Sequence, residues 1–387
     1  MRKLSITACL LLAVIFVHAQ KKELNNAYNS YLNGYHDRAK TAIDKAILND
    51  DTKNDAKAWL YRGNIYLRIA NSKENPKEKE YHNLCDNCAE IAYEAYLKAL
   101  ELDPAITVTN MGITDPKQGL KFCAGYLYNE AYKLFDSQQY EEAYSVLGKA
   151  NKADGTQEYI LFLLAYTAEI TKRTDIAKAH YNEMLRRKSK DIKPYQRLVN
   201  IYKLENDTAK VLNVMKAGEP IFLKDSIQVD YAIIYSIALS WAGETDEATE
   251  IMDKALEQYP DNHILLINYG SELSNQKKYK DAEKYLKRAV ELQPDEPIAI
   301  YNLGNCYYNN AVDKKKSARD IEDDKEYDRQ MEEATSLLEQ ARPYIEKAHE
   351  MDSKDRNTLI MLKGIYAELG LEEELKAIDE KIKELGR

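Results

Sequence analysis

The sequence predicts an all-α protein built from repeated helix pairs, and three observations lead to this fold class. First, 44% of the residues are hydrophobic and 31% are charged, enough apolar material for a long core beneath a solvated surface. Second, 30 tyrosines against 5 phenylalanines and 14 glycines fit half-buried helical surfaces carrying amphipathic rings. Third, small residues recur about every 34 residues, the spacing of an array that adds length without adding separate cores.

The amino terminus has the features of a secretory signal at residues 1–19. Arg2 and Lys3 precede an apolar run that ends near Val17, and the small residue Ala19 follows. The apolar run has about 14 residues, fewer than the roughly 20 that cross a bilayer as a helix, and no later segment is as apolar. We therefore expect Sec-type export to the periplasm, the cell exterior or the periphery of the outer membrane, and no transmembrane segment in the mature chain.

The charge balance bears on the kind of partner. Removal of the leader takes two of the 55 cations, which leaves 53 cations against 64 anions and a net charge of −11. Nucleic acids bind proteins mainly through cationic side chains that neutralise phosphates. We therefore expect no nucleic-acid partner.

The repeat unit is clearest at residues 263–296. Gly270 is followed after twelve residues by Ala282, after seven more by Ala289, and then by the helix-stopping Pro294. Small residues at these places let the two helices of one pair, and the first helix of the next pair, approach closely. The pattern resembles the tetratricopeptide repeat, in which each unit is a helix A followed by a helix B.

The same frame extends through nearly all of the mature chain, with two enlarged pairs. Gly63 and Ala92 are 29 residues apart, and Gly304 and Ala341 are 37 apart, where the motif has 12. A stretch between them, AITVTNMGITDPK, lacks helical periodicity and contains Gly112. The carboxyl end, LEEELKAIDEKIKELGR, is polar enough for a capping helix.

The resemblance implies a right-handed superhelical α-solenoid of about nine helix pairs. We expect an amino-terminal unit of two pairs at 20–106, with an insertion at about 71–88. A linker follows at 107–119. The rest, at 120–387, is expected to be an array of seven pairs that has an insertion at about 313–339 and ends in the capping helix.

One motif could carry site chemistry. His82, Cys85 and Cys88 stand in the first insertion at a spacing that suits three ligands of a metal ion. No second cysteine pair stands nearby to complete the coordination, and a redox CxxC would need a strand-to-helix junction that is not expected here. The favoured interpretations are a local disulfide, or two unpaired thiols, so we expect neither a metal nor another cofactor.

The resemblance also implies a binding groove, because certain helix A positions of the family face a bound peptide. In the third and fourth pairs these positions carry Tyr128, Tyr132, Phe135, Tyr159, Phe162 and Tyr166. Asparagine stands at the ninth position of three pairs, as Asn64, Asn200 and Asn305, where family members bond a peptide backbone. The prediction is an exported scaffold or adaptor that binds a protein or peptide in this groove.

Three alternatives compete with this prediction. The rings could fill gaps between helices without meeting a partner, the tyrosines could stack on a carbohydrate or another small ligand, or the HxxCxxC segment could handle a metal or a thiol. No Gly-rich phosphate loop, GxSxG elbow or HExxH motif occurs in the sequence. We therefore expect a protein without enzymatic activity.

Overall fold

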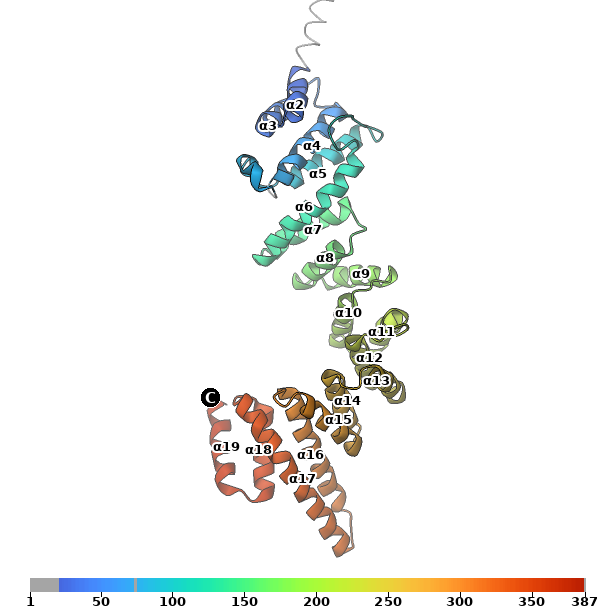
Figure 1. The fold of residues 1–387 in the computed structure, drawn as a ribbon, viewed down its shortest axis with the longest axis vertical. Helices are drawn as coiled ribbons and strands as arrows, with labels where there is room; N and C mark the ends of the chain where they lie inside the picture. The colour runs from blue at the N-terminus through green and yellow to red at the C-terminus, as the bar shows by residue number, and fades with distance from the viewer. Residues whose placement is uncertain (1–20, 73–74, 386–387) are drawn as a thin grey trace, which may run out of the picture. The chain divides into compact units, whose positions relative to one another are not determined.

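The computed structural model describes residues 21–72 and 75–385, so the predicted signal at 1–19 lies outside the described residues. Within those ranges the chain forms helices and turns and contains no strand. Eighteen α-helices follow one another as nine antiparallel pairs in this part of the chain, which confirms the predicted fold class of a solenoid of helix pairs (Figure 1). None of the described helices is both long enough and apolar enough to span a membrane.

The chain divides into two compact units, the first ending at Ser189 and the second beginning at Lys190. The helices of the first unit are α2 (Lys22–Leu32), α3 (His36–Ala46), α4 (Ala56–Ser72), the 3₁₀ helix η1 (Pro76–Tyr81), α5 (Cys88–Leu102), α6 (Pro116–Asp136), α7 (Tyr140–Ala153), α8 (Glu158–Ile170) and α9 (Thr174–Arg186). Those of the second unit are α10 (Lys193–Leu204), α11 (Thr208–Phe222), α12 (Val229–Ala242), α13 (Thr245–Gln258), α14 (His263–Asn275), α15 (Tyr279–Leu292), α16 (Pro297–Ala318), α17 (Asp324–Met351), α18 (Arg356–Leu369) and α19 (Glu372–Leu385).

Side-chain caps begin several of the helices. The side chain of Asn262 accepts a hydrogen bond from the backbone N–H of Leu265 and so begins α14. The Asp115 side chain does the same for Gln118 at the start of α6, whose first residue is Pro116. These caps satisfy backbone donors that the first turn of a helix leaves unpaired.

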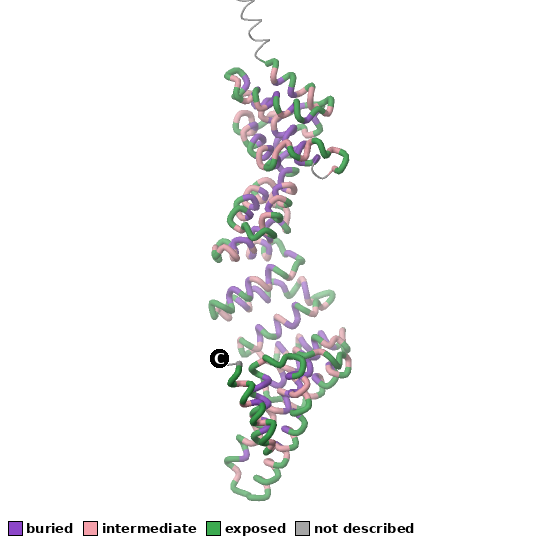
Figure 2. Tube along the Cα trace, turned by 90° about the vertical axis from the view of Figure 1, so that its left-hand side faces the viewer, coloured by how far each residue is buried: buried purple, intermediate pink, exposed green. Residues whose placement is uncertain are grey.

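Small residues hold the helices of a pair together, as the repeat spacing predicts. A Cβ placed on Gly270 would lie 2.6 Å from Cγ of Leu286 and 3.2 Å from the carbonyl oxygen of Ala282. Ala282 and Ala289 are themselves fully buried. Figure 2 shows that buried and exposed stretches alternate along the helices. They alternate because one side of each helix packs against neighbouring helices while the other side faces solvent.

The two predicted insertions take different forms. The first is a turn-rich segment around η1, and it is anchored to the first pair because the Tyr81 hydroxyl donates to the carbonyl of Gly34 at 3.0 Å. Arg68 and Glu78 form an ion pair at 2.5 Å beside it. The second is helical, since α16 and α17 simply continue into a longer hairpin that Lys314 and Glu333 bridge at 2.6 Å.

The predicted linker at 107–119 is not where the structure divides. Its last residues belong to α6, which begins at Pro116 and packs on α5. Val108 and Met111 are buried in the core of the first unit. The boundary falls instead at Ser189, in the short turn that precedes the pair the repeat frame fits least well.

Candidate partner-binding surfaces

Three tyrosines of the predicted groove form one ring group on α6 and α8. Tyr128 meets Tyr159 edge to face, with ring centroids 4.7 Å apart, and lies 6.2 Å from Tyr132. Tyr132 is 52% exposed and Tyr159 is 47% exposed, although both are large aromatic residues. Burial and the two neighbouring phenols raise the pKa of Tyr128, so its hydroxyl stays neutral and able to donate.

The other three predicted rings form a second group on the same two helices. Phe135 of α6 lies 5.7 Å from Tyr166 of α8, and Phe162 stacks on Tyr166 with centroids 6.2 Å apart. We call the six residues of both groups the ring-lined face. The structure therefore brings together all the aromatic residues that the helix A positions selected, and it leaves their outermost members uncovered.

The three predicted asparagines do not form one site, and Asn64 is not a partner-binding residue. Asn64 is 1% exposed, and its amide is engaged within the chain. Its Nδ2 donates to the carbonyl of Ile113 at 3.0 Å, while its Oδ1 accepts from the Tyr96 hydroxyl at 2.9 Å. Asn305 is half-buried on α16 of the second unit, and Asn200 alone of the three lines a hollow described below.

The segment before α6 explains why Asn64 is buried. It lies over α2 and α4, and the Tyr31 hydroxyl donates to the carbonyl of Met111 at 2.9 Å. The segment closes on itself through a bond from the Val108 N–H to the carbonyl of Thr114, and Gly112 turns it with a φ of 77°. The chain's own backbone thus occupies the place that the resemblance assigns to a bound peptide.

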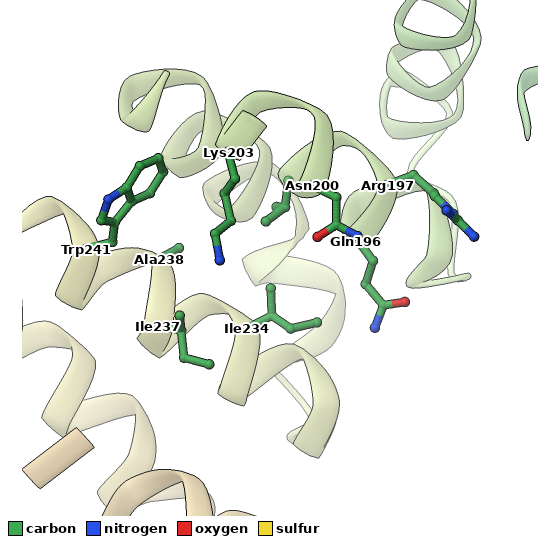
Figure 3. A pocket seen from close by; sticks show the side chains of 9 residues that line it. Gln196, Arg197, Asn200, Lys203, Ile234, Ile237, Ala238 and Trp241 are labelled. Carbon is green, nitrogen blue, oxygen red and sulfur yellow. The ribbon is translucent and has the colours of Figure 1, made fainter. Parts of the chain in front are cut away.

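A groove in the second unit lies between α10 and α12 (Figure 3). Its volume is about 370 Å³, and it is lined by Gln196, Arg197, Val199, Asn200, Lys203, Ile234, Ile237, Ala238 and Trp241. Asn200 contributes to the α10 wall. Ile237 and Trp241 of the apolar α12 wall were not among the predicted site residues. The 34-residue repeat places Ile237 at the ninth position of helix A in the sixth pair.

The two cysteines of the HxxCxxC segment are paired with each other. Cys85 and Cys88 are joined by a disulfide bond, so neither offers a thiolate to a metal. The ring of His82 lies near the carbonyl of Asn75, with Nε2 and O 3.2 Å apart. No group of three His, Cys, Asp or Glu residues suited to a metal ion occurs in the described ranges. Of the two favoured interpretations, the structure has the local disulfide rather than two unpaired thiols.

The fold and its surfaces define an all-α array of helix pairs. Residues 264–296 match the family model of the tetratricopeptide repeat, which covers the unit where the repeat frame is clearest. The chain therefore contains a tetratricopeptide repeat at these residues. No curated protein sequence matches it significantly.

Several solved structures are similar to this chain at low identity. MamA from MSR-1 is 18% identical over 51% of this chain and 98% of its own length, with a TM-score of 0.36. A tetratricopeptide repeat protein from Parabacteroides merdae is 14% identical over 70% and 98%, with a TM-score of 0.39. Yeast Tom70 is 12% identical over 94% and 84%, with a TM-score of 0.41.

Proposed function

We propose that this protein is a scaffold that binds a polypeptide partner on the ring-lined face of α6 and α8. The observation that carries the proposal is the exposure of Tyr132 and Tyr159 at the edge of a connected set of rings. Tyrosine supplies a large contact area at a small entropic cost and keeps a hydroxyl for hydrogen bonding. Such residues are enriched among those that dominate binding energy at interfaces.

The rings support each other before any partner arrives. Tyr128 is held between Tyr132 and Tyr159, so a partner does not have to immobilise it. Rigid aromatic groups lose less freedom on binding than flexible side chains do. The face is therefore suited to an apolar or aromatic segment of a polypeptide that also offers hydrogen-bonding groups.

The partner can be captured with the mature chain as bait in extracts of the cell envelope. A variant carrying Tyr132→Ala, Phe162→Ala and Tyr166→Ala is expected to lose the partner while keeping its helical circular dichroism. The matched control removes three exposed rings elsewhere, through Tyr35→Ala, Phe122→Ala and Tyr327→Ala. Equal recovery by the wild type and the first variant would remove the ring-lined face from the proposal.

We further propose that the scaffold acts after export, because residues 1–19 have the composition of a cleavable signal. Mass spectrometry of the protein from its native cells should find Gln20 as the first residue. A chain that retains Arg2 and Lys3 and stays in the cytoplasm would contradict this part of the proposal.

A further inference from the structure

The Cys85–Cys88 disulfide lies where the first insertion meets α5. Cys85 belongs to the turns that follow η1, and Cys88 is the first residue of the 15-residue helix α5. The pair therefore spans a turn-to-helix junction, although no strand precedes the helix. The N-terminus of a helix carries partial positive charge, which favours a thiolate there over a neutral thiol.

This disulfide contributes little to holding the insertion in place. A cross-link stabilises a fold mainly by constraining the unfolded chain, and the constraint grows with the length of the closed loop. Here the bonded residues are only three apart, so the closed loop is short. Other contacts anchor the insertion, namely the hydrogen bond from Tyr81 to the carbonyl of Gly34 and the ion pair of Arg68 with Glu78. The bond between the two sulfurs can therefore open while the insertion stays in place.

The two sulfurs differ in access. Cys85 is half-buried, and the next two residues, Asp86 and Asn87, are exposed. Cys88 is 2% exposed and belongs to the hydrophobic core of the first unit. Thiol–disulfide exchange begins when a thiolate attacks one sulfur of a disulfide, so its course depends on which sulfur can be reached. An incoming thiolate reaches Cys85, and Cys88 becomes the leaving group.

We propose that Cys85 and Cys88 form a thiol–disulfide exchange site that accepts two electrons from a dithiol of another protein. One thiolate of the dithiol attacks Sγ of Cys85, the Sγ–Sγ bond breaks, and Cys88 leaves as a thiolate at the start of α5. The second thiolate of the partner attacks the partner sulfur that is bonded to Cys85 and releases Cys85 as a thiolate. The thiolates of Cys85 and Cys88 take up, through water, the two protons that the partner's thiols have lost. The partner gains a disulfide, and Cys85 and Cys88 become thiols.

A protein dithiol suits this site better than a monothiol such as glutathione. The second thiol of a dithiol resolves the mixed disulfide within one complex, whereas a monothiol needs a second molecule. The reverse steps, with a protein disulfide as the oxidant, restore the bond between Cys85 and Cys88. This site goes beyond the proposed function because it reacts covalently and lies on the first insertion instead of the ring-lined face.

The first test compares the rate at which the disulfide is reduced in the folded and in the unfolded chain. The mature protein, in buffer or in urea, is mixed with a synthetic Cys-Gly-Gly-Cys peptide and quenched with an alkylating reagent. Mass spectrometry of the fragment that carries Cys85 and Cys88 gives each rate, which is divided by the rate for glutathione disulfide under the same conditions. Folding is expected to raise this relative rate by about tenfold, because only the folded chain places the leaving thiolate at a helix N-terminus.

Two single substitutions test which sulfur is attacked. Cys88→Ser leaves Cys85 as a thiol in the turn, and it should form a mixed disulfide with the oxidised form of the same peptide. The matched control Cys85→Ser leaves Cys88 in the core and should form the mixed disulfide about tenfold more slowly. Both variants keep the buried Cys123 and Cys306 as a common background. The variant without three rings of the ring-lined face should be reduced as the wild type is, so exchange and partner binding succeed or fail separately.

Three results would overturn the proposal. The first is a relative rate of reduction that is no higher in the folded chain than in the unfolded chain. The second is a loss of helical circular dichroism on reduction, which would mark the disulfide as a structural cross-link. The third is equally fast formation of the mixed disulfide by the Cys85→Ser and Cys88→Ser variants.

Discussion

The carboxamide of Asn64 donates a hydrogen bond to the backbone carbonyl of Ile113, with Nδ2 and O 3.0 Å apart. Its oxygen accepts a second bond from the Tyr96 hydroxyl. Asn64 thus binds a segment of its own chain. It stands at the ninth helix A position, which the resemblance to the tetratricopeptide repeat links to peptide recognition. The first two pairs therefore have an internal occupant, and the proposed partner surface is the ring-lined face of α6 and α8.

This relationship predicts different effects for the same substitution at two equivalent positions. Asn64→Ala should lower the free energy of unfolding by about 2–4 kcal/mol, because it leaves a buried carbonyl and a buried hydroxyl without a partner. Asn200→Ala, at an exposed residue, should change it by less than about 0.5 kcal/mol. Urea unfolding followed by circular dichroism measures both. Equal effects would show that Asn64 does not hold the segment before α6.

The ring of Tyr96 fills the space between Gly63 and Gly119. Substitution of the two glycines of α6 by alanine should therefore affect stability differently. A Cβ on Gly63 of α4 or on Gly119 of α6 would overlap the Tyr96 ring, whereas a Cβ on Gly125 of α6 would meet nothing within 4 Å. Gly119→Ala should therefore destabilise the protein by about 1–3 kcal/mol.

Gly125→Ala is the matched control for that substitution. It should be neutral or stabilising by up to about 1 kcal/mol, because alanine favours the helix and finds open space. Thermal unfolding of the two variants compares them directly. A stabilising Gly119→Ala would mean that Tyr96 does not occupy this space.

His36 predicts a dependence of stability on pH. It is buried against the ring of Tyr81, with centroids 4.7 Å apart. Burial, and then the charge of Arg68, hold the pKa of His36 below its usual 6.5, although Glu78 and Asp37 oppose this. Because the unfolded chain then binds the proton more readily, the contribution of His36 is complete above pH 6.5 and is lost as the pH falls through the folded-state pKa.

The measurement is the difference in the free energy of unfolding between wild type and His36→Phe as a function of pH. The wild type should lose stability relative to the variant as the pH falls below 6.5. The difference removes the effect of the other histidines, which both proteins share. Parallel curves would contradict the assigned pKa shift.

The cysteines predict a thiol count. The mature chain should show two thiols when it is denatured without a reductant, because Cys85 and Cys88 are bonded to each other. Reduction should raise the count to four. In the folded protein Cys123 and Cys306 should react slowly, since both are buried and burial raises the pKa of both thiols. Four thiols in the unreduced, denatured chain would exclude the disulfide.

The spacing of small residues along the sequence predicted the repeated helix pairs. Features that depend on contacts between residues far apart in the sequence were not predicted. Gly270 and Ala282 meet as the spacing required, because two helices of a pair can approach closely only at small residues. The helix A positions of the third and fourth pairs likewise predicted six aromatic residues, which do lie together on α6 and α8. These features depend on residues close in sequence and on a fixed geometry within each pair.

The burial of Asn64 could not be predicted in this way. Its partner Ile113 is 49 residues further on, in a segment without helical periodicity, and nothing local shows where that segment lies. The apolar wall of the α10–α12 groove needed only the repeat frame, which places Ile237 and Trp241 on helix A of the sixth pair. The prediction omitted them because it drew its rings from the third and fourth pairs and otherwise selected only asparagines.

The central claim is that the ring-lined face contacts a polypeptide partner in the cell. A photo-crosslinking amino acid at position 132 tests it most directly, with the same amino acid at position 327 as the control, since Tyr132 and Tyr327 are both exposed tyrosines. Irradiation of intact cells should give one discrete protein adduct from position 132 and none of that mass from position 327. Identical adducts from the two positions, or none from position 132, would contradict the claim.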